Sequence, residues 1–139
     1  MKILRIISAV LLLLVLNISW SQSPDPKATK RGDKLFNRFS YLKAAKVYES
    51  YLPSKDSAYI FRQLVESYLA LNDTDNSQKY LAKVVKQPIV EPKFYYEYAE
   101  ILAEQADYQH ANIWYEKYNS LVPSDERVIA KLGAVKNIS

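Results

Sequence analysis

The chain has 139 residues, which suits one small domain, and a net charge of +4. It contains no cysteine, which excludes disulfides and a lipid anchor attached through a cysteine. The fold must therefore be held together by the burial of side chains alone.

The N-terminus has the pattern of a secretory signal peptide. Lys2 and Arg5 precede an apolar run over residues 6–16, and small residues at Ser19 and Ser21 suit cleavage after residue 21. A helix of this run is too short to cross a bilayer, which takes about 20 residues. We expect residues 1–21 to be a cleaved signal, with an uncleaved anchor as the alternative. Export, together with the net charge of +2 that remains without these residues, argues against nucleic-acid binding.

Charge is unevenly distributed along the rest of the chain. Residues 22–58 carry eight basic and four acidic side chains, whereas residues 91–126 carry two basic and eight acidic ones. Residues 127–139 carry three basic side chains and no acidic one. The acidic zone is either an ordinary solvated surface or a docking face for a basic partner.

A linker over residues 22–27 leads into a region where apolar residues recur at helical spacing, without a strand pattern. We expect helices over residues 26–38, 41–52, 57–71, 74–86, 92–106 and 108–121. Pro53, Pro88 and Pro123 follow the second, fourth and sixth of these helices, where proline prevents continuation, and Pro92 suits a first helical turn. A seventh helix is expected from residue 125.

The sequence repeats with a period of 33–34 residues. Ala44, Ser77 and Ala111 are small residues separated by steps of 33 and 34. Large residues stand four positions later and again seven positions later: Tyr48, Leu81 and Tyr115, then Tyr51, Val84 and Tyr118. A small residue allows two helices to approach closely, and the large residues fill the gap to the next pair.

This pattern resembles the tetratricopeptide repeat (TPR), a 34-residue helix–turn–helix unit. Gly32 stands at the glycine position of that repeat, although the tryptophan of the fullest TPR pattern is absent. The resemblance implies an all-α fold, a TPR solenoid of three helix-turn-helix repeats plus a C-terminal capping helix. The expected TPR domain covers residues 28–139, with repeats over about 25–57, 58–91 and 92–124 and the capping helix over 125–137.

The sequence of the third repeat, "EPKFYYEYAEILAEQADYQHANIWYEKY", is similar to the N-terminal TPR part of OmpA-family envelope proteins of Bacteroidota. Relatives of that architecture serve type IX secretion and gliding motility. The resemblance implies a periplasmic location, with any attachment to the outer membrane made through a partner. This sequence ends at Ser139 without the propeller and peptidoglycan-binding parts, so cell-wall anchoring is not implied. A natural short protein and a truncated form remain alternatives.

The TPR resemblance also implies a binding groove lined by the first helix of each repeat. Its expected partner-binding residues are Tyr59, Arg62, Gln63, Glu66, Lys93, Tyr96, Glu97, Glu100 and Glu104, and repeat one adds Thr29, Asp33 and Asn37. The Lys/Asn clamp of TPRs that grip a C-terminal carboxylate is missing from the corresponding positions. The groove therefore fits a basic or amide-rich segment.

The stretch "FYYEY" divides between core and groove. Tyr95 and Tyr98 are expected to point into the hairpin core together with Ala99, Leu102 and Ala106. Phe94 is expected to seal against repeat two. Tyr96 is the aromatic residue that we expect to face the groove and a partner.

No combination of residues predicts catalysis, metal binding, a cofactor or a small-molecule substrate. The single histidine, His110, has no second histidine or cysteine with which to hold a metal. We therefore expect a non-enzymatic adaptor or scaffold subunit that docks onto a bacterial envelope protein complex. The alternative is a chaperone-like periplasmic module that binds extended segments of secreted proteins.

Overall fold

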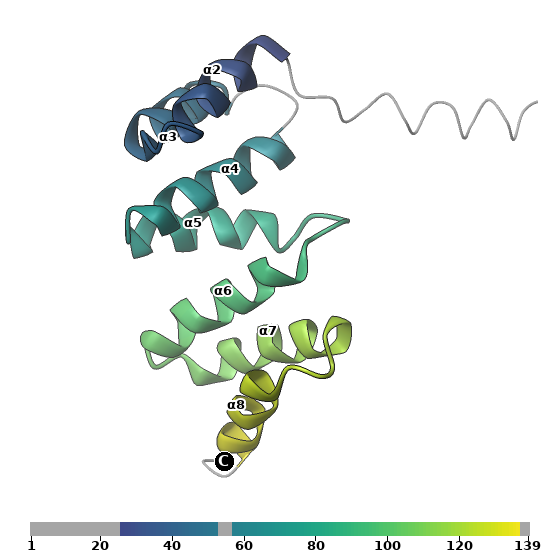
Figure 1. Cartoon of the computed structure of the whole chain (residues 1–139). Coiled ribbons are helices and arrows are strands. Elements are labelled where there is room, and N and C mark those ends of the chain that lie inside the picture. Colours follow the sequence, from purple (N-terminus) through teal and green to yellow (C-terminus); the bar gives the residue numbers. More distant parts are fainter. Residues whose placement is uncertain (1–25, 53–56, 137–139) are drawn as a thin grey trace, which may run out of the picture.

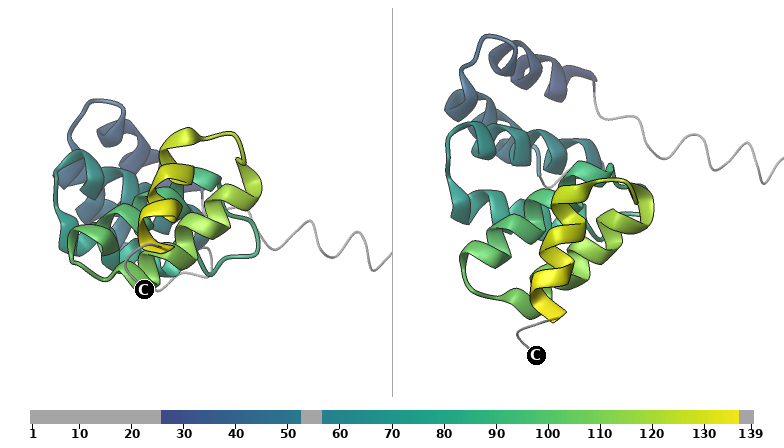
Figure 2. Two further views of the ribbon diagram at one scale, coloured as in Figure 1. Left: turned by 90° about the horizontal axis from the view of Figure 1, so that it is seen from below. Right: turned by 60° about the horizontal axis from the view of Figure 1, so that its bottom comes forward.

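The computed structural model describes residues 26–52 and 57–136, so the expected signal peptide, most of the linker and Pro53 lie outside the described part. In this part the chain forms seven α-helices and no strand. They are α2 (Pro26–Phe36), α3 (Tyr41–Ser50), α4 (Ser57–Ala70), α5 (Thr74–Val84), α6 (Pro92–Glu104), α7 (Tyr108–Leu121) and α8 (Glu126–Lys136). Three hairpins, α2–α3, α4–α5 and α6–α7, stack one upon the next (Figure 1), and α8 lies across the last of them (Figure 2). The predicted all-α solenoid with a capping helix is confirmed.

The turns inside the three hairpins share one backbone conformation. Phe39, Asn72 and Ala106 have positive φ values of 58°, 52° and 61°, and they are separated by the repeat's own steps of 33 and 34 residues. In each turn the next backbone N–H reaches back to a carbonyl near the end of the first helix; the N–H of Asp107, for example, donates to Leu102 at 2.9 Å. The left-handed residue stops the helix, which is why each first helix ends one or two residues earlier than expected.

Ala106 does not belong to the hairpin core, contrary to the prediction. It is the exposed turn residue at φ 61°, whereas Tyr95, Ala99 and Leu102 are buried as expected. Tyr98 is half-buried and packs its ring on Trp114, with the ring centres 5.4 Å apart. The sequence period alone placed Ala106 on the core stripe because the period does not reveal where the helix ends.

Replacing Ala106 by glycine is expected to stabilise the protein. A left-handed conformation costs a residue with a Cβ roughly 1–2 kcal/mol, and glycine avoids this cost. The greater conformational entropy of glycine in the unfolded chain offsets roughly 0.5–1 kcal/mol of that gain. A net gain of about 0.5–1 kcal/mol should appear in urea unfolding followed by far-UV circular dichroism. The control is Asn72→Gly, where the gain should be smaller because asparagine tolerates this conformation. If Asn72→Gly stabilised the protein as much as Ala106→Gly, or if Ala106→Gly destabilised it, the backbone strain assigned to Ala106 would be contradicted.

The core forms two clusters that meet at the third hairpin. The first gathers α3, α4 and α5 and includes Phe94 and Ile101 of α6, so the prediction that Phe94 seals against repeat two is confirmed. The second gathers α6, α7 and Val128 of α8. The small residues Ala44, Ser77 and Ala111 are 0–1% exposed, as their role at the close approach of two helices requires.

Buried and half-buried tyrosines donate hydrogen bonds to carboxylates of neighbouring helices. Asp33 of α2 accepts hydrogen bonds from Tyr48 of α3 at 2.6 Å and from Tyr59 of α4 at 2.9 Å. Glu49 of α3 accepts from Tyr68 and Tyr80, both at 2.8 Å. These four tyrosine hydroxyls are therefore paired, whereas an unpaired buried hydroxyl would cost about 1–3 kcal/mol.

None of the helices in residues 26–52 and 57–136 combines the length and the apolar character that crossing a bilayer requires.

Candidate functional site

The first helices of the three hairpins and the capping helix form one continuous surface. Side chains connect them in series: Tyr59 of α4 donates to Asp33 of α2, Lys93 of α6 pairs with Glu66 of α4, and Lys131 of α8 pairs with Glu100 of α6. The capping helix thus takes the place of a fourth first helix. We call this the first-helix surface; it carries all nine of the predicted partner-binding residues, on α4 and α6.

The predicted residues of repeat two are held within this surface. Glu66 pairs with Lys93, and Arg62 lies 3.9 Å from Glu91. The hydroxyl of Tyr59 is bound to Asp33, and burial followed by that hydrogen bond raises the pKa of Tyr59 to about 12. Gln63 is half-buried, and its backbone carbonyl accepts the hydroxyl of Ser67. The charged groups of α4 are therefore already compensated.

Tyr96 is half-buried between α7 and α8. Its ring lies 5.6 Å from that of Tyr118 and 6.2 Å from that of Tyr115. Arg127 of α8 lies over the ring at 5.1 Å, and Lys131 lies 5.9 Å from its centre. Tyr96 also lines a hollow of about 250 Å³ together with Glu97 and Arg127. The capping helix thus supplies cations to the aromatic face that the sequence prediction assigned to a partner.

The three glutamates predicted on one face of α6 have different surroundings. Glu100 accepts a hydrogen bond from Tyr115 and pairs with Lys131, so it joins α6 to α7 and α8. Glu97 and Glu104 make no hydrogen bond or ion pair with any side chain that the structure describes. Burial raises the pKa of Glu97, the neighbouring carboxylates of Glu100 and Glu66 raise it further, and the positive charge of Lys93 lowers it. The carboxylates of α6 that have no hydrogen-bond or ion-pair partner among the described residues are therefore those of Glu97 and Glu104.

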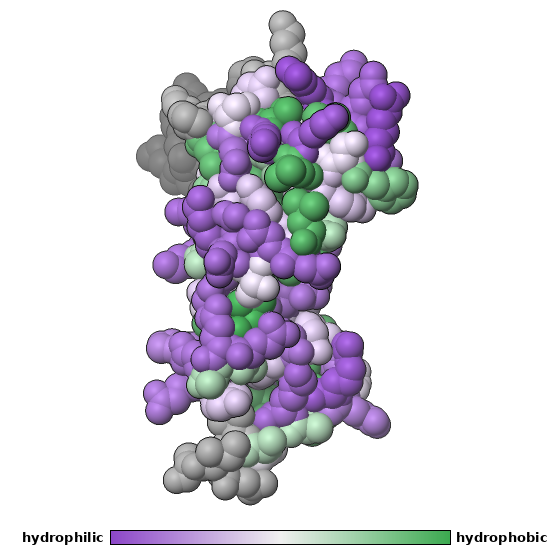
Figure 3. All heavy atoms as spheres, turned by 90° about the vertical axis from the view of Figure 1, so that its left-hand side faces the viewer, coloured by the Kyte–Doolittle hydropathy of each residue, from purple (hydrophilic) through white to green (hydrophobic). Residues whose placement is uncertain are grey.

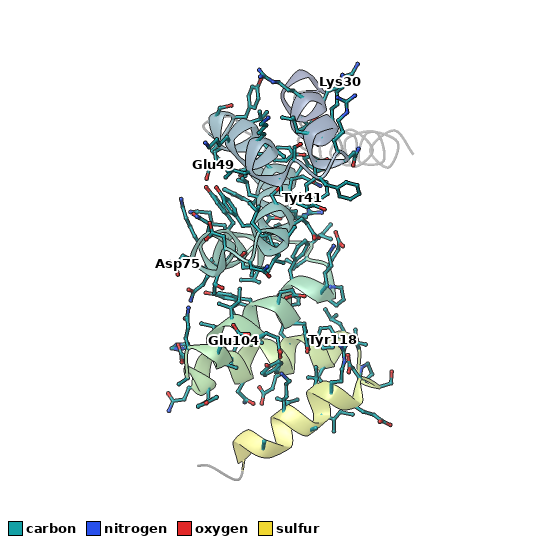
Figure 4. The ribbon with its side chains drawn as sticks, turned by 60° about the vertical axis from the view of Figure 1, so that its left-hand side comes forward. Lys30, Tyr41, Glu49, Asp75, Glu104 and Tyr118 are labelled. Carbon is teal, nitrogen blue, oxygen red and sulfur yellow. The ribbon has the colours of Figure 1, made fainter. Side chains whose placement is uncertain are left out.

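These two glutamates line a hollow between α6 and the start of α5, which we call the acidic hollow. Its volume is about 180 Å³, and its lining consists of Leu69, Asn72, Thr74, Ser77, Glu97, Glu100, Ile101 and Glu104. The hydroxyl of Ser77, a residue only 1% exposed, has no hydrogen-bond partner among the described residues. Figure 4 labels Glu104 on α6, near the α6–α7 turn. The acidic hollow thus contains two carboxylates, Glu97 and Glu104, and one hydroxyl, that of Ser77, without a hydrogen-bond partner among the described residues.

The sequence did not identify the α5 side of this hollow. The repeat pattern predicts only a packing role for Ser77, and it gives no role to Asn72 and Thr74, which fall where the helices expected over 57–71 and 74–86 meet. The position of Asn72 is held by Phe39 and Ala106 in the other repeats, and that of Thr74 by Tyr41 and Tyr108. The polar residues at the turn of repeat two were therefore the sequence feature that could have indicated this side of the hollow.

His110 is exposed, and its Nδ1 lies 2.8 Å from a carboxylate oxygen of Asp107. Asp107 caps α7 by accepting from the backbone N–H of His110, and the hydrogen bond to the imidazole lowers the pKa of this carboxyl. Among the described residues, no group of three His, Cys, Asp or Glu side chains is arranged to hold a metal ion.

No protein-family model matches the sequence, and no curated protein matches it. Solved structures do. The second TPR domain of human RPAP3, in complex with an HSP70 peptide, gives a TM-score of 0.59 at 16% identity, covering 77% of this chain and 90% of that domain.

The type III secretion chaperone SycD of Yersinia enterocolitica matches in two structures. The complex with a peptide of the translocator YopD gives a TM-score of 0.63 at 20% identity, covering 82% of this chain and 95% of that one. An alternative dimer of SycD gives 0.60 at 19% identity, covering 82% and 94%. At these identities the likeness shows a common fold: this chain folds as a TPR solenoid.

Proposed function

We propose that this protein is a non-enzymatic TPR adaptor that binds a basic or amide-rich segment of a protein partner in the acidic hollow. The observation that carries the proposal is the contrast on α6 between Glu100, which is bound to Tyr115 and Lys131, and the unpaired Glu97 and Glu104. Leaving the half-buried carboxylate of Glu97 unpaired opposes folding, because burial favours its neutral form. A lysine or amide side chain from a partner would supply the missing donors.

Two of the structural neighbours are complexes with a peptide: RPAP3 with an HSP70 peptide and SycD with a peptide of YopD. The HSP70 peptide ends in the acidic sequence EEVD. In the present chain, two predicted groove residues are carboxylates that already have partners. Asp33 accepts hydrogen bonds from Tyr48 and Tyr59, and Glu66 pairs with Lys93. Acidic tails of that kind are therefore poor ligands for this surface, and a segment of opposite charge is favoured.

An adaptor is preferred to a chaperone for unfolded clients because of the chemistry of the hollow. Apolar side chains contribute only Leu69 and Ile101 to its lining, while three carboxylates surround them. Extended segments of unfolded proteins are recognised largely through apolar side chains, which gain nothing beside carboxylates. We further propose that the protein acts in the bacterial envelope, as part of the type IX secretion or gliding machinery. The N-terminal signal pattern and the sequence of repeat three support this location.

A peptide titration tests the proposal. A fluorescent extended peptide of lysine, asparagine and glutamine should bind more tightly than a matched peptide in which glutamate replaces lysine. Glu97→Gln with Glu104→Gln should weaken binding of the basic peptide by about tenfold, equal to about 1.4 kcal/mol. The control, Glu116→Gln with Glu126→Gln, removes two exposed carboxylates that do not line the hollow and should leave binding unchanged. Equal binding of the two peptides, with the basic one not weakened by Glu97→Gln with Glu104→Gln, would contradict the proposal.

Glu100 should be avoided in such tests. Charge reversal at this residue would remove an acceptor from the buried Tyr115 and a partner from Lys131, so it would loosen the capping helix as well as alter the surface. For capture of partners from envelope extracts, Glu97→Lys with Glu104→Lys is the appropriate variant. A fixed complex that survives this double reversal would contradict the assignment of the hollow.

A further inference from the structure

The first hairpin carries positive charge that no described residue compensates. Lys30, Arg31, Lys34, Arg38, Lys43 and Lys46 make no ion pair with any residue that the structure describes. Between residues 29 and 52 the acidic residues are Asp33 and Glu49, and each accepts hydrogen bonds from two tyrosines instead. On the third hairpin and α8, by contrast, Lys93, Arg127 and Lys131 all have carboxylate partners.

Five of these cations surround a groove between α2 and α3, which we call the basic groove. Its volume is about 500 Å³, and its lining consists of Arg31, Lys34, Leu35, Arg38, Lys43, Lys46 and Val47. Cations from α2 and the following turn stand at helical spacing on one side, and Lys43 and Lys46 of α3 stand on the other. Leu35 and Val47 are half-buried in the same groove, so its lining combines an apolar strip with two basic rows.

Two exposed apolar side chains lie at the turn of the same hairpin. Phe39 is 78% exposed and Leu42 52% exposed. In Figure 3 green hydrophobic spheres lie among purple hydrophilic ones over the N-terminal hairpin at the top of the molecule. Phe39 also holds the strained left-handed position of its turn, where Asn72 stands in repeat two. A large apolar side chain is thus kept exposed where a smaller residue would fit the backbone better.

The basic groove lies at the open end of the solenoid. The α2–α3 hairpin packs its other side against α4, and α8 covers the opposite end of the stack, but no described element covers this end (Figure 1). Figure 4 shows Lys30 at this end and Glu104 in the third repeat, with the second hairpin between them. The basic groove and the acidic hollow are therefore separate surfaces of opposite charge.

We propose that the basic groove binds an acidic amphipathic helix of a partner protein. A helix with an apolar stripe flanked by glutamates or aspartates would cover Leu35 and Val47 while its carboxylates meet the two basic rows. A flat anionic bilayer would contact the rim cations and leave the apolar strip uncovered. A second copy of this chain is a poorer fit, because its unpaired carboxylates line the small acidic hollow and do not flank an apolar stripe on a helix. The inference goes beyond the proposed function because it gives the protein a second partner surface.

Fluorescence anisotropy with a defined probe tests this inference. The probe is a labelled helical peptide of about five turns, roughly 18 residues, with leucines along one face and glutamates on both flanks. A scrambled peptide of equal composition has no apolar stripe. The helical probe should bind at least about tenfold more tightly than the scrambled one, and Lys34→Glu with Lys46→Glu should weaken its binding by about tenfold or more. Lys86→Glu with Lys117→Glu, two exposed lysines elsewhere, is the matched control.

Three results would overturn the inference. Equal binding of the helical and scrambled peptides would leave only non-specific charge attraction. Tighter binding to vesicles of phosphatidylcholine and phosphatidylglycerol, lost in the Lys34→Glu/Lys46→Glu variant, would identify a lipid surface instead. Sedimentation velocity showing self-association that the same variant abolishes would identify a second copy. The Glu97→Gln/Glu104→Gln variant should bind the helical probe normally, so failure of this inference is distinguishable from failure of the proposed function.

Discussion

Replacing Gly32 by alanine is expected to lower the free energy of unfolding by about 2–3 kcal/mol, because the core has no room for one more methyl group. A Cβ at this position would lie 2.4 Å from Cε1 of Tyr48 and 2.7 Å from its Cζ. The ring cannot move aside easily, since Tyr48 is 0% exposed and its hydroxyl is bound to Asp33. The loss should appear in urea unfolding as a lower midpoint with an unchanged slope.

Gly133 provides the matched control, because a Cβ built there meets no atom within 4 Å. Gly133→Ala should therefore stabilise α8 by up to about 1 kcal/mol through helix propensity alone. Repeat two suggests a rescue, since Val65 and Leu81 occupy the positions of Gly32 and Tyr48. Gly32→Ala combined with Tyr48→Leu should be more stable than the sum of the two single effects predicts. Strict additivity would show that the ring is not what excludes the methyl group.

The repeat pattern predicted the fold well because packing in a TPR depends on residues at fixed spacing. Ala44, Ser77 and Ala111 defined the register, and all three are buried at close helix contacts. Pro92 begins α6 as expected, and the helix bounds agree to within two residues. Helical periodicity identifies the buried side of each helix, and three similar units constrain one another's boundaries.

The partners of the polar groups could not be predicted in the same way. They depend on the rotation between successive hairpins, which periodicity along one helix does not determine. One signal was available: Tyr48 and Asp33 are 15 residues apart, and so are Tyr115 and Glu100 in the third repeat. Repeat two holds Leu81 at the tyrosine position, so its carboxylate, Glu66, is left to pair with Lys93.

The candidate site was predicted only in outline for the same reason. The sequence placed nine residues on the first helices, and all of them lie on the first-helix surface. It also showed a basic N-terminal region and an acidic third repeat. Which charges remain unpaired is a property of the assembled stack, in which α8 compensates Glu100 and surrounds Tyr96. Tyr96 therefore has cations of its own chain at its ring, whereas Glu97 and Glu104 have no partner among the described residues.

High pH is expected to unfold the protein in one steep transition linked to tyrosine ionisation. Burial, followed by hydrogen bonds to Asp33, Glu49 and Glu100, raises the pKa of four buried tyrosines well above 10: Tyr48, Tyr68, Tyr80 and Tyr115. Their folded pKa exceeds the unfolded value of 10.0, so this stabilisation is complete below pH 10 and is lost as the pH rises toward the folded pKa. Each group lowers the free energy of unfolding by about 1.4 kcal/mol per pH unit, and four together by roughly 5 kcal/mol. Since a small domain has about 5–15 kcal/mol in total, unfolding should follow within a few pH units above 10.

Tyrosinate absorbance and far-UV circular dichroism, recorded on the same samples, test this expectation. The absorbance of the buried tyrosines should rise together with the loss of helix, because these hydroxyls ionise only when the stack opens. Glu49→Gln is the informative variant, since it keeps an acceptor near Tyr68 and Tyr80 but removes the negative charge that disfavours their ionisation. In this variant stability should decline less steeply with pH above 10. Complete tyrosine ionisation with the helices intact would contradict the role given to these carboxylates in holding the repeats together.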